Sequence, residues 1–453
     1  MKWLKWTILV IGVLVLILAA LPFFISLDDF IPEIEKQAAE RLKEPVKIGS
    51  LRAAALPLPH LTVDGITVGK TGDIQVGRVT VTPDLWSLLG PTKVIKSIEV
   101  ERLVLTQKAL EKIPAWTRPE GAKPAPPGEP PALRVESVRL EEALVKLAKA
   151  SFGPFDARLD LSGAGDLESA SIVTKDGKLR AEVRPEKANY RIDAVAKSWT
   201  PPAGPPVVLD ELAVKGVATH KDAVLEQVRA RLYGGTVSGR TTVAWHKGVQ
   251  IRGSAEVSQV ELKQLVPLLA PGTNMSGKLS AKPVFSAAAR EAGQLMNALR
   301  LETPFSVQDG VLYGVDIGKA ATSILGKDGA KGGETRFDQL SGHLVLDRGT
   351  YRFTNLNVAS GALAADGNVT ISPKQELSGR INASVKAGSV TAANVPLNVS
   401  GTVHSPLLLP TAGYVAGAAA GTAVLGPGLG TSVGATVGGW TERLFGRKEE
   451  KKK

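Results

Sequence analysis

The chain has 453 residues, 43% of them apolar and 22% charged, so it is long enough for two or three ordinary domains or for one elongated domain. It contains no cysteine, which excludes disulfides, thiolate catalysis and cysteine-ligated zinc. The net charge of +11 fits a generally basic surface, an anionic membrane or a nucleic acid, and composition alone does not choose between these partners.

The first 27 residues predict a short cytoplasmic start and a transmembrane anchor. Residues 7–27 are apolar and uncharged, and about 20 such residues suffice to cross a bilayer as a helix. Lys2 and Lys5 precede this run and favour a cytoplasmic N-terminus, which leaves the bulk of the chain exported. A cleaved signal peptide is the alternative, and it would export the chain as well. The residues expected inside the bilayer include Ile8, Leu14, Leu18, Phe23 and Phe24.

Residues 28–113 are expected to form an amphipathic helix and a first β segment. Apolar residues recur at helical spacing between Ile31 and Leu42, with Pro32 in the first turn. In the strands that follow, two apolar-x-apolar pairs are repeatedly separated by two residues. Strict alternation would put the second pair on the opposite face, so we expect a β-bulge that restores it to the same face. The spacing occurs at Leu61–Val68, Ile74–Val81, Ile98–Leu105, Val138–Val145 and Tyr351–Val358.

Residues 114–131 are rich in proline and are expected to be a linker or a surface loop. The main β region follows in residues 132–410. Short helices are expected within it at residues 261–269, 287–299 and 316–325.

The C-terminal residues 411–453 are rich in glycine and alanine and end in a basic tail. Glycines recur every four residues in two runs, Gly413–Gly421 and Gly430–Gly438, which puts them on one face of each helix. This spacing predicts a hairpin of two short helices, and disordered sequence is the alternative.

The clearest pattern in the chain is the period-two alternation of apolar and polar residues between Thr335 and His404. This alternation is typical of strands with one apolar and one polar face. Turn residues such as Asp366-Gly367 separate consecutive strands, and short turns favour an antiparallel meander. The fold class is therefore expected to be mostly β, an elongated, curved antiparallel sheet with an N-terminal transmembrane helix and a few short helices.

The apolar face of this sheet must be covered. Either the sheet closes on itself as a sandwich or barrel, or it forms an open apolar groove that receives a ligand. An exposed apolar lining of this size would promote aggregation unless a ligand covered it. For an exported chain tethered to a bilayer, the available apolar ligand is lipid. The candidate lipid-binding residues are Leu344, Leu346, Tyr351, Phe353, Leu356, Val358, Leu363, Val369, Ile371, Ile381, Val385, Leu397 and Val399.

No motif in the sequence carries recognisable catalytic chemistry. The five histidines are scattered without ligand spacing. Residues Gly65–Thr71 resemble a phosphate loop but are one residue short, and no helix pattern follows, so a turn between strands is expected. The basic residues are not accompanied by the aromatic side chains on which the bases of single-stranded nucleic acid stack. We therefore expect no enzyme activity, no cofactor, no metal site and no nucleic-acid partner.

Further short motifs occur in order along the chain. They are Pro45–Gly49, Pro57–Val68, Leu85–Val100, Leu232–Gly239, Phe305–Asp316 and Val395–Thr402. In their order and in the architecture around them, these stretches resemble the AsmA family of Gram-negative envelope proteins, which includes TamB-like and YhdP-like members. The resemblance covers the chain from the anchor to about residue 410. The chain is short for this family, and its glycine-rich tail is not part of the family pattern.

The resemblance implies a periplasmic β-groove that is anchored in the inner membrane by a single span. It also implies a role in moving phospholipids toward the outer membrane and in outer-membrane integrity, without catalytic residues. The expected function is thus to bind phospholipid acyl chains and pass them along the groove. The alternative is a lipid-free periplasmic scaffold that assists outer-membrane protein assembly with envelope protein partners. An enzyme acting on envelope lipids is a third reading, and it would need polar residues clustered in a pocket.

Overall fold

The computed structural model describes residues 27–54, 56, 58–110, 112, 133–147, 151–202, 204–219, 221–246, 248–290, 292–322, 332–387, 390–391, 394–425, 432, 435–436 and 439. The predicted anchor, with Ile8, Leu14, Leu18, Phe23 and Phe24, and the proline-rich stretch 114–131 lie outside these residues. Among the residues that are described, no helix is both long enough and apolar enough to cross a membrane.

Of the residues that the structure describes, 63% lie in strands and 16% in helices, which confirms the expected, mostly β class. The chain divides into two compact units. Unit 1 consists of Met1–Ala203 and Lys215–Thr219, and unit 2 consists of Gly204–Val214 and His220–Lys453. Strand β12 (Leu209–Ala218) contributes residues to both units.

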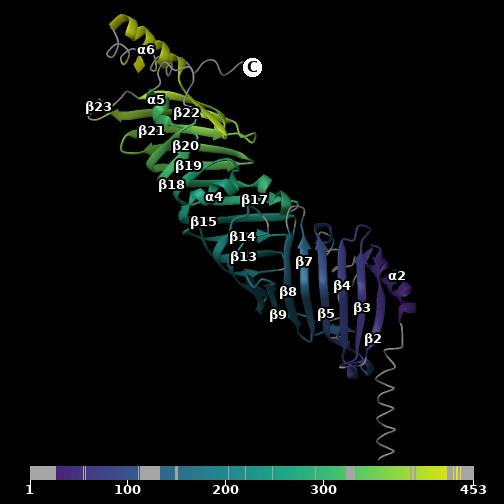
Figure 1. Ribbon diagram of the computed structural model, residues 1–453. Coiled ribbons are helices and arrows are strands. Elements are labelled where there is room, and N and C mark those ends of the chain that lie inside the picture. The colour runs from purple at the N-terminus through teal and green to yellow at the C-terminus, as the bar shows by residue number, and fades with distance from the viewer. Residues whose placement is uncertain are drawn as a thin grey trace, which may run out of the picture. The chain divides into compact units, whose positions relative to one another are not determined.

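Unit 1 begins with the 3₁₀ helix η1 (Asp28–Phe30) and the helix α2 (Ile31–Leu42), as the helical spacing predicts. Figure 1 shows α2 beside the first strands of this unit. A second 3₁₀ helix, η2 (Trp86–Leu89), lies in the connection from β4 to β5. The strands are β1 (Val46–Lys47), β2 (Ser50–Ala54), β3 (His60–Val68), β4 (Ile74–Pro83), β5 (Lys93–Thr106), β6 (Leu133–Val135), β7 (Ser137–Lys146), β8 (Ser151–Leu161), β9 (Leu167–Thr174), β10 (Leu179–Glu186) and β11 (Asn189–Trp199).

The sheet of unit 1 is mixed, and the expectation of a purely antiparallel sheet is wrong at one place. Most neighbours along the chain pair antiparallel, but β5 pairs in parallel with both β6 and β7. Antiparallel neighbours can share a two-residue hairpin, whereas a parallel pair needs a crossover of a dozen or more residues. The long proline-rich connection between Thr106 and Leu133 is therefore a crossover between parallel strands.

The repeated apolar spacing predicts β-bulges at five places, and the structure shows a register shift at two of them. In the pairings among β3, β4 and β5, no shift occurs within Leu61–Val68, Ile74–Val81 or Ile98–Leu105, so the prediction is wrong there. The pairing register shifts between Leu140 and Ala143 in β7 and between Phe353 and Leu356 in β20 (Thr350–Ala359). The extra residue of the β20 bulge, Asn355, has a φ of 51°, and its N–H donates to Oδ1 of Asn368 at 3.0 Å. Because the backbone N–H of this bulge is bonded by a neighbouring side chain, the strand accommodates the extra residue without an unpaired donor.

Unit 2 continues with a second run of strands and four short helices. The helices are α4 (Leu262–Leu269), the 3₁₀ helix η3 (Ala292–Ala298), α5 (Ile317–Thr322) and α6 (Ala412–Leu425). The strands are β13 (Asp222–Leu232), β14 (Gly235–Ala244), β15 (Val249–Glu261), β16 (Met275–Ala281), β17 (Val284–Ala289), β18 (Arg300–Tyr313), β19 (Glu334–Asp347), β20, β21 (Leu363–Ile371), β22 (Leu377–Ala387), β23 (Val390–Thr391), β24 (Val395–Thr402) and β25 (Ser405–Pro410).

Helices expected at 261–269 and 316–325 are found as α4 and α5, but the helix expected at 287–299 is only partly present. Its first residues belong to strand β17, where Ala287 pairs with Ile251 of β15. Only η3 is helical, and it is a 3₁₀ helix. Pairing of β17 with β15 overrides the helical preference of the alanines, since tertiary context outweighs propensity.

The C-terminal helical hairpin is described in part. Its first helix is α6, and residues 432, 435, 436 and 439 of the second run are helical. Ala435 belongs to the same buried cluster as Tyr414 and Ala418 of α6. The two runs therefore contribute to one buried cluster.

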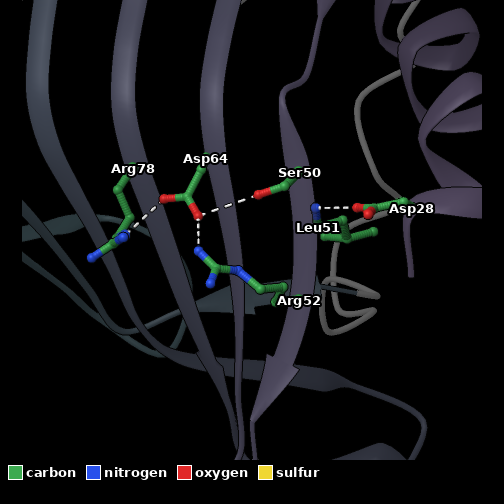
Figure 2. Close-up of polar contacts among 6 residues, drawn as sticks. All are labelled: Asp28, Ser50, Leu51, Arg52, Asp64 and Arg78. Atoms are coloured by element: carbon green, nitrogen blue, oxygen red, sulfur yellow. Dashed lines mark hydrogen bonds and ion pairs between the residues drawn. The ribbon is translucent and has the colours of Figure 1, made fainter. Parts of the chain in front are cut away.

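Asp64 on β3 joins three neighbouring strands of unit 1 (Figure 2). Its Oδ1 accepts a hydrogen bond from Arg78 Nε on β4 at 2.8 Å, and its Oδ2 accepts from Arg52 on β2 and from Ser50 Oγ at 3.4 Å. Partial burial disfavours the charged carboxylate, but the hydrogen bonds and charges of Arg78 and Arg52 outweigh it. The pKa of Asp64 is therefore lowered below its ordinary value of 3.8.

We expect Asp64→Asn to destabilise unit 1 at neutral pH by on the order of 1 kcal/mol, because both arginines are largely exposed and the ion pairs are screened. A carboxylate whose pKa is lower in the folded state stabilises the fold at any pH above its unfolded-state pKa. This stabilisation is lost as the pH falls through the folded-state pKa. The difference from wild type should thus disappear well below pH 3.8. Hydrogen exchange of the β2, β3 and β4 amides at neutral pH and well below pH 3.8 measures this local destabilisation. The exposed turn variant Asp166→Asn is the control, and an equal loss in both variants would contradict the assignment.

Candidate functional site

The predicted lipid-binding residues of unit 2 all lie on one face of its sheet. Residues paired across neighbouring strands point to the same face. Leu344 on β19 pairs with Phe353 on β20, which pairs in turn with Val369 on β21. This row continues through Gly379 of β22 to Val399 of β24. The other rows of the face are Leu346–Tyr351–Ile371, Leu356–Gly367–Ile381–Leu397, Val358–Ala365–Ala383–Val395 and Leu363–Val385. We call this surface the apolar face.

The opposite face of the same strands is polar. Between the apolar positions of β21 and β22 stand residues such as Asp366, Asn368 and Asn382. Asn382 Nδ2 donates to Oδ2 of Asp366 at 3.1 Å across the two strands. The alternation in the sequence therefore separates an apolar face from a polar face. Because of the bulge at Asn355, the apolar residues on both sides of it in β20 point to the apolar face.

Phe305 on β18 extends the apolar face and was not among the predicted residues. Its ring lies over Gly342 of β19, so that a Cβ at this glycine would come within 3.2 Å of the ring. The ring also meets Phe353 edge-on, at 6.0 Å between centroids and 85° between planes. Gly342 thus leaves room for an aromatic ring to lie along the sheet. An aromatic residue two positions along its strand from apolar Val307 is the sequence signal that could have identified it.

Helices α5 and α6 cover one end of the apolar face. Their side chains form a single buried cluster with β21, β22, β24 and β25, which includes Ala320, Ala418 and Tyr414. Burial raises the pKa of Tyr414 above its usual value, so this tyrosine stays neutral at physiological pH. The predicted residues under this cover have exposed fractions of 8% for Leu363, 8% for Ile381, 0% for Leu397 and 9% for Val399. Val358, Val369 and Val385 pack against the same cluster.

Helix α4 covers a second, smaller part of the face. Leu262 of α4 forms a buried cluster with Val307 of β18 and Phe337 of β19. The helix begins at Glu261, whose side chain accepts hydrogen bonds from the N–H groups of Lys263 at 3.0 Å and Gly277 at 3.2 Å. The cap therefore fixes α4 against strand β16.

The part of the face outside these covers is more accessible. Tyr351 is 38% exposed, and Leu344, Phe353, Leu356 and Ile371 are half-buried. Leu346, in the same row as Tyr351, is 9% exposed. The structure thus divides the predicted residues into one group that the protein's own side chains enclose and another that a ligand can reach.

Charged and polar side chains line a separate pocket in unit 1, which has a volume of about 400 Å³. Lys112 Nζ contacts Glu44 Oε1 at 2.6 Å and Asp73 Oδ2 at 3.0 Å. The hydrogen bond from Thr71 and then the one from Lys112 lower the pKa of Asp73, and the hydrogen bonds to Glu44 and then Asp73 raise the pKa of Lys112. Lys43, Pro45, Lys70 and Lys108 complete the lining. Since Lys112 engages both carboxylates, the pocket contains no free acid–base pair.

The described residues hold no group of three histidine, aspartate or glutamate side chains that could bind a metal. His343 Nε2 on β19 lies 2.9 Å from Glu302 Oε1. His404 Nε2, in the turn between β24 and β25, lies 2.9 Å from Gln375 Oε1. The phosphate-loop-like residues Gly65–Thr71 form the end of β3 and a turn into β4, as expected.

We expect Leu397→Ala to cost about 2–5 kcal/mol, because it opens a cavity beneath α5 and α6. Local opening is the appropriate readout in a chain with two units, since a single unfolding energy is not defined there. Hydrogen exchange of β22 and β24 amides should therefore accelerate strongly. Leu269→Ala, at a side chain that is 55% exposed, is the control and should change exchange little. Unchanged exchange in Leu397→Ala would mean that this cluster is not a packed core.

The chain was compared with known proteins in three ways. A scan against protein-family models gives no match, and neither does a search of curated proteins or of solved structures.

Proposed function

We propose that the protein is an inner-membrane-anchored periplasmic protein that binds phospholipid acyl chains on the apolar face of unit 2 and passes them along a groove toward the outer membrane. The proposal joins the apolar run of residues 7–27, the resemblance to the AsmA family and the geometry of unit 2. It requires no covalent step, no cofactor and no metal. In this view the protein supports outer-membrane integrity by supplying lipid.

The observation that carries the proposal is the accessible section of the apolar face. Cross-strand pairing aligns Leu344, Phe353 and Val369 in one row and Leu346, Tyr351 and Ile371 in the next. Tyr351 keeps 38% of its surface exposed on this face. Burial of acyl chains there would yield about 25 cal/mol per Å² of apolar surface. Such a surface binds any acyl chain of suitable length without specific polar contacts.

The covered end of the face sets a condition on this proposal. Leu397 is fully buried under α5 and α6, so an acyl chain cannot reach it while these helices remain in place. Passage beyond β22 therefore requires α5 and α6 to move, or the chain must leave the face before it reaches them. The two helices act as a cap in this proposal.

The alternative function is a lipid-free scaffold that assists the assembly of outer-membrane proteins. The buried cluster under α5 and α6 favours it, because the protein fills this part of the face with its own side chains. The accessible section around Tyr351 and Phe353 favours lipid binding instead. The two functions therefore differ in what occupies that section in the cell.

Photo-crosslinking at neighbouring positions distinguishes them. A benzoyl-phenylalanine placed at Tyr351 or at Phe353 in cells should yield phospholipid adducts, identified by mass spectrometry. Arg352 lies between them and points to the polar face, so the same residue there is a matched control. Strong adducts at 351 and 353 with few at 352 support lipid carriage. Equal yields at all three positions would favour the scaffold.

A further inference from the structure

We propose that one edge of unit 1 docks on the surface of a phospholipid bilayer through exposed apolar residues. This edge lies at one end of the strands, where the connections leave the sheet. It comprises the β2–β3 connection, the β4–β5 connection with η2, and the start of β6, and we call it the loop edge. The proposal rests on the membrane anchoring proposed above, but it is independent of lipid carriage by unit 2.

The loop edge presents large apolar side chains to solvent. Trp86 is 85% exposed and Leu89 is 87% exposed, both on η2. The neighbouring connection presents Leu56 and Leu58, at 58% and 61%. Leu133, the first residue of β6, is 58% exposed. Adjacent apolar side chains with this degree of exposure mark an interaction site more often than a solvent-facing surface.

Strand pairing brings these residues to one edge. His60 pairs with Ala54 where β2 turns into β3, and Leu61 pairs with Val81 near the end of β4. Lys93, at the start of β5, pairs in parallel with Leu133. The connections that carry Leu58, Trp86 and Leu89 therefore leave the sheet on the same side as the start of β6.

The exposed apolar residues of unit 1 are unevenly distributed. Among the residues described in this unit, every exposed large apolar side chain except Leu61, near the start of β3, and Val195 lies on η1, on α2 or at the loop edge. The opposite ends of β3 and β4 meet the turn that carries Lys70, beside Lys43 and Lys108 of the polar pocket. One edge is thus apolar and the other is charged.

The tip around η2 holds its shape without its apolar side chains. Ser87 Oγ donates to the carbonyl oxygen of Asp84 at 2.7 Å and accepts from the N–H of Val94 at 2.8 Å. The N–H of Gly90 donates to the carbonyl oxygen of Ser87 at 2.9 Å. Because these bonds fix the turn, Trp86 and Leu89 are presented on a defined tip and are not required for its folding.

The position of the chain's first described residue points to a bilayer as the partner. The N–H of Leu27 donates to the carbonyl oxygen of Leu51 at 3.4 Å, and Asp28 Oδ1 accepts from the N–H of Leu51 at 2.9 Å (Figure 2). Leu51 lies on β2, a few residues before the loop edge. The apolar run of residues 7–27 therefore joins unit 1 beside the exposed residues, and a bilayer that holds this run would meet them. Tryptophan and leucine at such a tip suit the membrane–water interface.

The absence of cysteine makes single-cysteine labelling a direct test. The full chain is placed in nanodiscs of phosphatidylethanolamine and phosphatidylglycerol that contain spin-labelled lipid. An environment-sensitive fluorophore is attached to Trp86→Cys or Leu89→Cys. Thr71→Cys, in an exposed turn at the opposite ends of β3 and β4, is the matched control. Leu18→Cys reports whether the apolar run itself is inserted.

We expect blue-shifted emission and several-fold stronger quenching by lipid at positions 86 and 89 than at position 71. Quenching at 86 and 89 no greater than at 71, with Leu18→Cys quenched, would overturn the docking proposal and leave lipid carriage untouched. A blue shift without lipid quenching would also overturn it, because a protein surface would then cover the tip. If Leu18→Cys is unquenched as well, the anchoring and the docking both fail.

Discussion

The central constraint on this protein is that its strands have one apolar face and that few helices are available to cover it. In unit 2, α4, α5 and α6 bury parts of that face, and the side chains around Tyr351 and Phe353 remain half-buried or exposed. Apolar surface that stays in contact with water is costly in proportion to its area. The arrangement of helices therefore decides where a ligand could gain binding energy and where the protein has already filled the space.

The bulges maintain this arrangement. A one-residue change of register would move an entire set of apolar side chains to the polar face. The extra residue in β20, Asn355, compensates such a change, and its N–H is bonded by Asn368 on the neighbouring strand. The corresponding bulge in β7 has Glu142 at a φ of 56°, with its N–H bonded to Oδ1 of Asp156 at 3.0 Å. In both units, a side chain on the neighbouring strand thus accepts a hydrogen bond from the N–H of the extra residue.

Local pattern was sufficient to predict most strands, the bulges of β7 and β20 and the shared face of residues such as Leu344 and Phe353, because side-chain alternation is a local property. It wrongly predicted bulges in β3, β4 and β5, whose pairings keep one register at those positions. It could not predict which residues of the shared face are enclosed. The cover over Leu397 comes from α5 and α6, and the helical spacing that predicts these helices does not show which part of the sheet they pack on. The parallel pairing of β5 and β7 was missed for a similar reason, since a proline-rich connection does not reveal which edge the chain rejoins.

This parallel pair also bears on how unit 1 is assembled. Strands β2 to β5 and β7 to β11 each pair with their neighbours along the chain, so each group can form through contacts of short sequence separation. Joining the groups requires closure of the long connection between Thr106 and Leu133, and such non-local contacts form slowly. We therefore expect two local meanders to form first and their union to limit the folding rate. Until that step, the facing backbone edges of β5 and β7 would be open to pairing with other chains.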